Sequence, residues 1–235
     1  MSNDLKGLIE APSLSRYLRI SNELKTISLT RFLQYELIEK IDLKGSVLDF
    51  GGGDKALYKP LLKCKDYQSA NIDKTILPTF LLQSSEPIPC NDKIFDTVIS
   101  FNTLEHIYNA KAALEEMHRV LKKQGELLIT TPFLFPVHGH PDDFFRPTSS
   151  WYIEALSKVG FTDIKVVPLF WGPLSTGQVC SGVPGPFRQI RKNIALLLDI
   201  IYFKFKLNRK KIIQYQQDDP ICSTPLGYFI SSIKR

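Results

Sequence analysis

The feature that most constrains this chain is a short apolar run that ends in three glycines, Val47 to Phe50 followed by Gly51–Gly53. The apolar run predicts a buried strand, and the helix-compatible segment 56–62 follows the glycines. Glycine is needed where the backbone turns with positive φ or approaches a ligand closely. A strand, a glycine turn and a helix N-terminus together form a cradle for a cofactor. Asp73 follows the next predicted strand, where a carboxylate can accept both ribose hydroxyls. The pattern predicts an adenosine-containing cofactor.

Strands alternate with helices along most of the chain, which favours a doubly wound, mostly parallel α/β sheet. Residues 13–41 predict one or two helices, and further helices are predicted at 109–121, with a basic last turn at 122–124, and at 149–159. The seven predicted strands are 47–50, 68–72, 79–82, 95–101, 126–131, 161–168 and 228–233. We therefore expect a helical N-terminal cap (1–42) on an α/β domain (43–235) that carries a basic helical insertion (184–218) before its last strand.

Several motifs resemble the class I S-adenosylmethionine-dependent methyltransferases. The order Asp49-x-Gly51-x-Gly53 resembles their first motif, although Gly51-x-Gly53-x-x-Ala56 also satisfies a loose dinucleotide pattern. Residues 95–107 resemble the family's fourth-strand motif, and residues 118–129 resemble its helix and fifth strand.

The resemblance implies a Rossmann-like methyltransferase fold with S-adenosylmethionine as cofactor. It places the methionine part of the cofactor on the loop that follows Asp49, and the ribose on Asp73. The complete set of cofactor-binding residues that we expect is Asp49, Gly51, Gly52, Gly53, Asp73, Asn102 and Glu105. Family members often carry an acidic residue beside the adenine, where this chain has Ser84-Ser85, so the adenine contact stays open.

The composition narrows the class of protein. Hydrophobic residues make up 43% of 235 residues, which is enough for a sizeable core, and the four cysteines lack metal-ligand spacing. The chain shows neither a signal-peptide pattern nor a run of about 18 apolar residues, so we expect a cytoplasmic protein. The net charge is +6, of which residues 188–211 supply +7, with eight basic residues and one acidic residue. A charge confined to one segment argues against a nucleic-acid-binding fold.

The loop after the predicted fifth strand, residues 135–148, combines histidines, carboxylates, an arginine and aromatic residues. It resembles the His-x-x-Pro-x-Asp-x-x-Arg-x-Thr stretch of methyltransferases encoded with surface-polysaccharide pathways. The matching positions are His138, Pro141, Asp143, Arg146 and Thr148.

A hydroxyl acceptor needs a general base, and histidine suits that role near neutral pH. We expect His138 to be the base, with His106 and His140 as second choices. Asp143 and Arg146 would fix the loop and bind polar groups of the acceptor. Alternatively, Asp143 and Arg146 only tie the loop to itself. A third hypothesis is a metal site formed by His138, His140, Asp142 and Asp143.

The basic segment 188–211 predicts an amphipathic helix. At about 100° per residue, one side carries Ile190, Ile194, Leu197, Leu198, Ile201, Tyr202 and Phe205, and the other carries Arg188, Lys192, Asp199, Lys206 and Lys210. Such a helix packs with its apolar side on the domain or on a second copy in a homodimer. Alternatively, it lies on an anionic bilayer, which would place the protein peripherally on the inner face of the membrane.

We therefore expect an S-adenosylmethionine-dependent methyltransferase, without a resident metal, that O-methylates a sugar or a glycan precursor. Methylation of another small metabolite, an amine or a lipid, is the alternative within that class. An NAD-dependent oxidoreductase on a similar fold and a binding module without catalysis are the alternatives from other classes.

Overall fold

The computed structural model describes residues 10–23, 26–83, 86–139, 142–182, 185–206 and 224–235. A seven-stranded sheet forms its centre, in the order β3-β2-β1-β4-β5-β7-β6. Only β7 runs antiparallel to its neighbours, β5 and β6. The doubly wound, mostly parallel sheet predicted from the sequence is confirmed. The strands are β1 Ser46–Phe50, β2 Asp66–Asn71, β3 Phe80–Leu81, β4 Phe95–Phe101, β5 Leu121–Pro132, β6 Phe161–Leu169 and β7 Gly227–Lys234.

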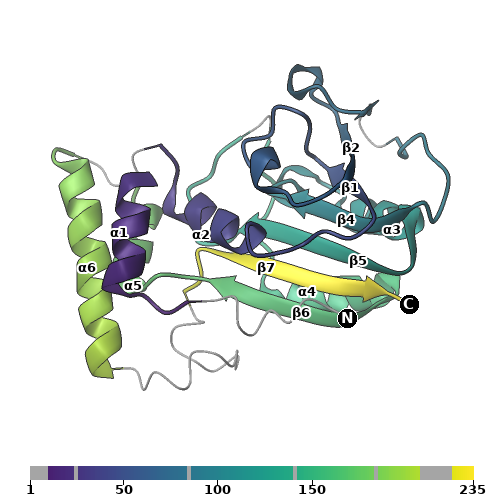
Figure 1. The fold of residues 1–235 in the computed structure, drawn as a ribbon. Coiled ribbons are helices and arrows are strands. Elements are labelled where there is room, and N and C mark those ends of the chain that lie inside the picture. Colours follow the sequence, from purple (N-terminus) through teal and green to yellow (C-terminus); the bar gives the residue numbers. More distant parts are fainter. Residues whose placement is uncertain (1–9, 24–25, 84–85, 140–141, 183–184, 207–223) are drawn as a thin grey trace.

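Helices cover both faces of the sheet (Figure 1). On one face α3 and α4 bury Leu114, Met117 and Leu156 against β4 and β5. On the other face α2 buries Phe32, Leu33 and other apolar side chains against β1 and β5. The α-helices are α1 Leu14–Glu23, α2 Leu29–Ile38, α3 Ala110–Val120, α4 Ser149–Val159, α5 Pro173–Cys180 and α6 Arg188–Lys206. Three short 3-10 helices are η2 Lys59–Leu61, η3 Lys74–Ile76 and η4 Leu104–His106.

Two local predictions are wrong. Segment 56–62 forms only the 3-10 turn η2, because Pro60 lacks a backbone N–H and disfavours the α conformation at the residue before it. No α-helix N-terminus therefore follows the glycine turn. The predicted basic turn at 122–124 is not helical, because the chain becomes extended at Leu121, which pairs with Phe95 as the first residue of β5. The last turn of α3 carries His118 and Arg119 instead.

The N-terminal helices are fixed on the domain by a buried ion pair. Arg16 of α1 is 3% exposed and its Nε donates to both carboxylate oxygens of Glu36 on α2, each at 3.1 Å. The guanidinium of Arg16 also lies 5.0 Å from the ring centroid of the fully buried Trp171. The predicted cap is thus helical, and it shares one core with the sheet.

The orientation of α6 is the reverse of the predicted one. Asp199, expected on the polar outer side, is fully buried and caps the N-terminus of α5, because its carboxylate accepts from the N–H groups of Leu174 (3.0 Å) and Ser175 (2.8 Å). Most of the predicted apolar side faces outward instead: Ile190, Ile194, Leu198, Ile201 and Phe205 are between 45% and 85% exposed. Helix α5, which the sequence did not suggest, supplies the N–H groups that draw Asp199 inward. Residues 207–211 of the basic segment lie outside the described residues.

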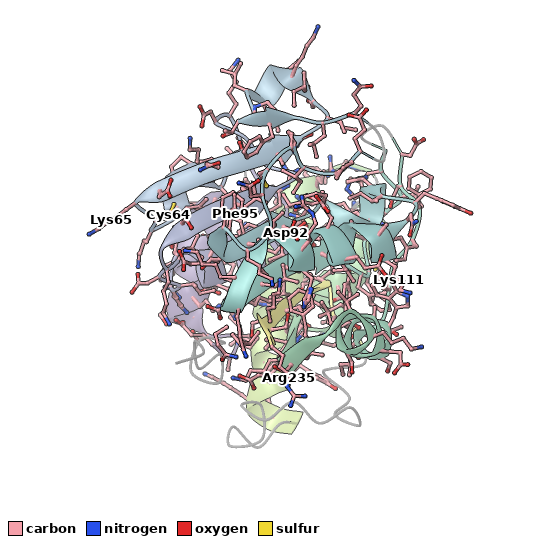
Figure 2. All side chains as sticks on the ribbon, turned by 90° about the vertical axis from the view of Figure 1, so that its right-hand side faces the viewer. Cys64, Lys65, Asp92, Phe95, Lys111 and Arg235 are labelled. Atoms are coloured by element: carbon pink, nitrogen blue, oxygen red, sulfur yellow. The ribbon has the colours of Figure 1, made fainter. Side chains whose placement is uncertain are left out.

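The parallel strands all point toward α1, α2, α5 and α6. Figure 2 looks onto the opposite edge of the sheet, where Lys65 and Phe95 mark the starts of β2 and β4. Ligands of open α/β sheets bind at the carboxyl ends of the strands. The candidate site is therefore at the other edge, beside the N-terminal helices (Figure 1).

Candidate active site

The glycine loop after β1 is shaped by close contacts. Gly51 has φ of 97°, and a Cβ there would lie 2.1 Å from Oγ1 of Thr103 in the loop after β4. A Cβ on Gly52 would lie 1.8 Å from Oδ2 of Asp49, and one on Gly53 would lie 2.4 Å from the carbonyl oxygen of Ile76. These distances exclude any side chain at the three glycines unless the neighbouring chain moves.

The same loop offers hydrogen-bond donors. Gly52 and Gly53 are buried, and within the described residues no partner is found for either backbone N–H. Buried backbone N–H groups are normally paired, so a ligand acceptor at this position would satisfy them. Two successive free N–H groups suit a carboxylate. The loop therefore fits the methionine carboxylate of the predicted cofactor.

Asp49 supports this loop from inside the protein. Its side chain is fully buried and accepts hydrogen bonds from the hydroxyls of Tyr58 (2.9 and 3.0 Å) and Tyr67 (2.7 Å). Burial raises the pKa of Asp49 to about 7, although both hydroxyls favour its charged form. The sequence analysis missed these tyrosines, although a buried carboxylate must find donors somewhere in the chain.

The end of β2 joins the loop from the other side. The Asn71 side chain donates to the carbonyl of Gly51, and its Oδ1 accepts from the N–H of Asp73 at 2.8 Å. Asp73 accepts from the N–H and the hydroxyl of Thr75, at 2.8 and 2.7 Å, and so begins η3. Asp73 thus follows β2 as predicted, beside the glycine loop, and its contact with the ribose stays a prediction.

Asn102 anchors α2, and its predicted contact with the cofactor stays a prediction. Its side-chain amide pairs reciprocally with that of Gln34, with N–H···O distances of 2.7 and 2.9 Å. Its φ is 51°, a left-handed conformation that asparagine tolerates better than most residues. Because both ends of the amide are used by Gln34, the side chain positions the N-terminal helix beside the loop after β4.

The loop after β5 docks on the loop after β4. The N–H of Phe144 donates to the carbonyl of Glu105 at 2.9 Å, and Nδ1 of His106 contacts the carbonyl of Asp142. Nδ1 of His106 must carry its proton to make this hydrogen bond, so Nε2 is left to face the site. Two loops that are about 36 residues apart in sequence are thereby held together.

Docking gathers three titratable groups: Glu105, His106 and His138 each have a ligand atom within 4.8 Å of the others. The rings of His106 and His138 meet edge to face with centroids 5.2 Å apart. Glu105 is fully buried, and neither of its carboxylate oxygens has a hydrogen-bond partner within the described residues. Burial raises the pKa of Glu105 to about 8, so it is mostly protonated at neutral pH and can donate a hydrogen bond.

His138 is held at its backbone and at one ring nitrogen. Its N–H donates to Oδ2 of Asp143 at 2.9 Å, and its Nδ1 lies 3.4 Å from the same oxygen and 3.3 Å from a guanidinium nitrogen of Arg146. Desolvation lowers the pKa of His138, so the ring is neutral near pH 7. A base role for Nε2 requires the tautomer in which Nδ1 carries the hydrogen and points it toward Oδ2 of Asp143, which leaves Nε2 unprotonated.

Asp143 and Arg146 form a two-pronged ion pair, in which both carboxylate oxygens contact the guanidinium. The Arg146 guanidinium lowers the pKa of Asp143 to about 2, and the Asp143 side chain is 3% exposed. The ion pair therefore holds the loop in place, which is what one of the two hypotheses drawn from the sequence stated. It also orients His138.

The candidate metal ligands that the structure brings together differ from the predicted set. Both oxygens of Asp143 are used by Arg146, and His140 lies outside the described residues, as do Ser84 and Ser85. The group that the structure assembles is Glu105, His106 and His138, a donor set that suits a divalent transition metal. A carboxyl group that keeps its proton at neutral pH is a poor ligand, so this set favours proton transfer over metal binding.

Comparisons with known proteins agree with this geometry. Residues 48–129 match the family described as "Methyltransferase domain". A Mycobacterium tuberculosis protein named as a probable S-adenosylmethionine-dependent methyltransferase is 28% identical over 92 residues, which are 37% of this chain and 34% of that protein. An uncharacterised protein of Methanocaldococcus jannaschii is 33% identical over 103 residues, 40% of this chain and 44% of that one. The matches thus span about a third to under half of these relatives.

Solved structures extend the likeness to the whole fold. An S-adenosylmethionine-dependent methyltransferase of Thermotoga maritima aligns with a TM-score of 0.55 at 16% identity, over 93% of this chain and 98% of that chain. At this identity the likeness shows the fold. The family match favours methyltransferase over the nicotinamide-dependent alternative. Residues 48–129 therefore match a methyltransferase domain, and the named relative of this segment is described as S-adenosylmethionine-dependent.

Proposed function

We propose that the protein transfers a methyl group from S-adenosylmethionine to a hydroxyl of a sugar or glycan precursor, with His138 as general base. The observation that carries the proposal is the held His138 ring, neutral near pH 7, beside Glu105 and His106 at the carboxyl edge of the sheet. The likeness of residues 138–148 to methyltransferases of polysaccharide pathways supports the class of acceptor.

The cofactor would be held by the chain's own backbone and carboxylates. The N–H groups of Gly52 and Gly53 would bind its carboxylate, and Asp73 would bind its ribose. When bound, S-adenosylmethionine supplies a methyl group already activated by a sulfonium centre. The protein must then align the acceptor and exclude water.

The chain's main chemical task is to remove a proton. The acceptor oxygen forms the new C–O bond while the C–S bond breaks, the bonding pair stays on sulfur, and the hydroxyl proton moves to Nε2 of His138. Asp143 and Arg146 hold the ring throughout, because they fix its Nδ1 side. Neutral Glu105 would donate a hydrogen bond to the acceptor or cofactor.

His138→Ala should lower the methyl-transfer rate by about 10²- to 10⁴-fold while binding of S-adenosylhomocysteine stays near the parent value. His138→Gln should behave similarly, since it fills the space without serving as a base. Val137→Ala is the matched control, because the neighbouring side chain is 89% exposed. The assay follows S-adenosylhomocysteine release with sugars, sugar phosphates and nucleotide sugars as acceptors.

The same assay separates the alternatives. An unchanged rate for His138→Ala on the true acceptor would contradict the base and favour an amine, which needs only to be neutral. Loss of activity on adding EDTA would instead support the metal hypothesis. Binding of NAD with no binding of S-adenosylhomocysteine would overturn the whole proposal.

We further propose that the outer face of α6 contacts an anionic lipid surface. Five large apolar side chains are exposed along this face, and Lys204, itself exposed, lies at its edge. Leu14 and Leu18 of the adjacent α1 extend this apolar surface, because each of them is about 60% exposed. An apolar stripe bordered by basic residues is typical of helices that lie in a membrane interface. Within the described residues, no helix is long and apolar enough to span a bilayer.

A further inference from the structure

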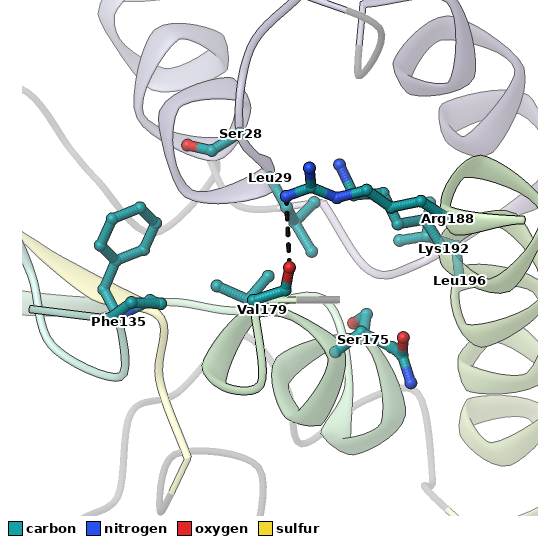
Figure 3. A pocket seen from close by; sticks show the side chains of 11 residues that line it. Ser28, Leu29, Phe135, Ser175, Val179, Arg188, Lys192 and Leu196 are labelled. Carbon is teal, nitrogen blue, oxygen red and sulfur yellow. Dashed lines mark hydrogen bonds between the residues drawn. The ribbon is translucent and has the colours of Figure 1, made fainter. Parts of the chain in front are cut away.

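A cavity of about 160 Å³ opens between α2, α5, α6 and the loop after β5. Its walls are mostly apolar, with Leu29 from α2, Phe135 and Pro136 from the loop, and Val179 and Leu196 from the two C-terminal helices. Figure 3 shows Arg188 and Lys192 extending from α6 into the same space.

The cavity adjoins the candidate base. Phe135, which forms one wall, packs edge to face on His138 with ring centroids 5.2 Å apart. Leu29, on another wall, lies about one and a half helical turns before Gln34, which anchors α2 to Asn102. The cavity is therefore built from the segments that position the site, and an acceptor seated there would contact Phe135, whose ring packs on His138.

The charged side chains that line the cavity, among the described residues, are positive. Arg188 and Lys192 line it, and none of the described acidic residues does so. Arg188 donates to the carbonyl of Gly182, at 3.2 Å, and within the described residues Lys192 has no ion-pair partner. Burial and the neighbouring Arg188 lower the pKa of Lys192, because each disfavours the charged form of the lysine. The sequence had placed both residues on a solvated outer face.

One further polar residue, Gln178, lines the cavity. Oε1 of Gln178 on α5 is buried and accepts no hydrogen bond within the described residues. A buried acceptor left unpaired costs free energy, so a ligand hydroxyl would satisfy it. Apolar walls, one amide acceptor and two cations are the features of a site for a ligand with a hydroxyl-bearing body and an anionic end.

We propose that this cavity is the acceptor site and that the acceptor carries a phosphate group, which binds Arg188 and Lys192. The inference rests on the proposed methyl transfer and narrows its substrate class. A phosphate supplies close to two negative charges near neutral pH, enough to balance both cations, whereas one carboxylate balances only one. Arginine pairs with phosphate through two parallel hydrogen bonds and lysine through a point charge. Gln178 then accepts from a hydroxyl on the body of the acceptor.

The phosphate has two possible sources, a sugar phosphate or a lipid phosphate. Calorimetry with the S-adenosylhomocysteine-saturated protein distinguishes them, with glucose 1-phosphate and dihexanoyl phosphatidic acid as probes and glucose as the uncharged control. We expect the phosphorylated probes to bind and glucose to bind at least tenfold more weakly. The tighter of the two phosphorylated probes identifies the source. Binding of glucose as tight as that of both phosphorylated probes would overturn the inference, as would a lack of binding by all three.

Variants of the two cations test the assignment of the site. Arg188→Gln and Lys192→Gln should each weaken binding of the tighter probe by about tenfold or more, as expected for hydrogen bonds to charged groups. Lys158→Gln, an exposed change on α4 outside the cavity, should leave binding unchanged. Equal affinity in all three variants would overturn the inference.

Binding of S-adenosylhomocysteine reports separately on the fold and the cofactor site. All three variants should bind it as the parent does, because none of these residues contacts the glycine loop. Failure of the parent to bind it would count against the proposed function. Unchanged phosphate binding in the cation variants, together with normal cofactor binding and methyl transfer, would count against the cavity alone.

Discussion

The buried carboxylate of Asp49 should make the stability of this fold depend on pH. It is fully buried below the cofactor loop, and its charge is supported only by the hydroxyls of Tyr58 and Tyr67 among its described hydrogen-bond donors. Asp49→Asn keeps the shape of the side chain and removes its titration. The variant therefore separates the packing role of this residue, under Gly52, from the cost of its charge.

The expected magnitude follows from the pKa. Burial raises the pKa of Asp49 from 3.8 to about 7. Between these two pH values the folded state keeps the proton that the unfolded state has lost, so stability falls as pH rises. The difference of about three pH units, at about 1.4 kcal/mol each, amounts to about 4 kcal/mol. The loss should be absent below about pH 4, develop between pH 4 and 7, and be complete above about pH 7.

Urea denaturation at pH 4, 5.5, 7 and 8 would measure this effect as the difference in unfolding free energy between parent and Asp49→Asn. Taking the difference cancels the titration of all other groups. Asp54→Asn, a 58% exposed carboxylate in the same loop, is the control. A parent-to-Asp49→Asn difference that stays constant from pH 4 to 8 would refute the reasoning. Near-parental binding of S-adenosylhomocysteine by Asp49→Asn would show that shape, and not charge, supports the loop.

Three further predictions address the site. Gly51→Val should abolish binding of S-adenosylhomocysteine and lower the melting temperature, since its Cβ would meet Thr103 at 2.1 Å and its φ of 97° is unfavourable for valine; calorimetry and thermal melts check this. The methyl-transfer rate should be bell-shaped in pH, rising as His138 loses its proton below pH 6.5 and falling near pH 8 as Glu105 ionises; a pH profile in which Glu105→Gln keeps the alkaline fall would contradict the second assignment. Co-sedimentation with anionic vesicles should weaken with salt and be lost in Leu198→Ser without a change in melting temperature; no binding at low salt rules out the lipid contact, and concentration-dependent dimers lost in the same variant would point to a second copy.

The sequence predicted well where burial alone decides structure. The bounds of β4 and α4 agree with the predicted 95–101 and 149–159, because a run rich in apolar residues and a glycine stop carry their own signal. Gly160, with φ of 110°, ends α4 by a backbone conformation that most residues avoid. Such features depend on neighbouring residues in the chain and therefore show in the sequence.

The orientation of α6 could not be predicted in the same way. Apolar residues occupy most of its circumference, so periodicity does not say which side is buried. The deciding interaction is the capping of α5 by Asp199, between residues that are about 25 positions apart. Since α5 itself was not predicted, its unsatisfied N–H groups could not be foreseen as partners. A single acidic residue in a basic helix was the available signal, and it was assigned to solvent.

The candidate site likewise combines features that a local pattern predicts with contacts between residues far apart in the sequence. The glycine loop and Asp73 follow from local pattern, but the grouping of Glu105, His106 and His138 requires the docking of two loops. Asn102 was assigned to the cofactor from its position, and the pairing of its amide with Gln34 was not foreseen. A position in a motif thus indicates which edge of the sheet a residue occupies, while its partner depends on helices that the motif does not contain.

The contacts around Asn102 link the cofactor loop to the proposed acceptor cavity. Gly51 packs against Thr103. Asn102, which directly precedes Thr103, pairs with Gln34, and the first turn of α2 supplies Leu29 to the cavity wall. Each contact is either a close packing that excludes a methyl group or a reciprocal amide pair, so none can shift without disturbing the next. The N-terminal helices therefore belong to the site and not merely to its cover. The spacing between cofactor loop and acceptor cavity, on which in-line transfer depends, is set by a helix that lies outside residues 48–129.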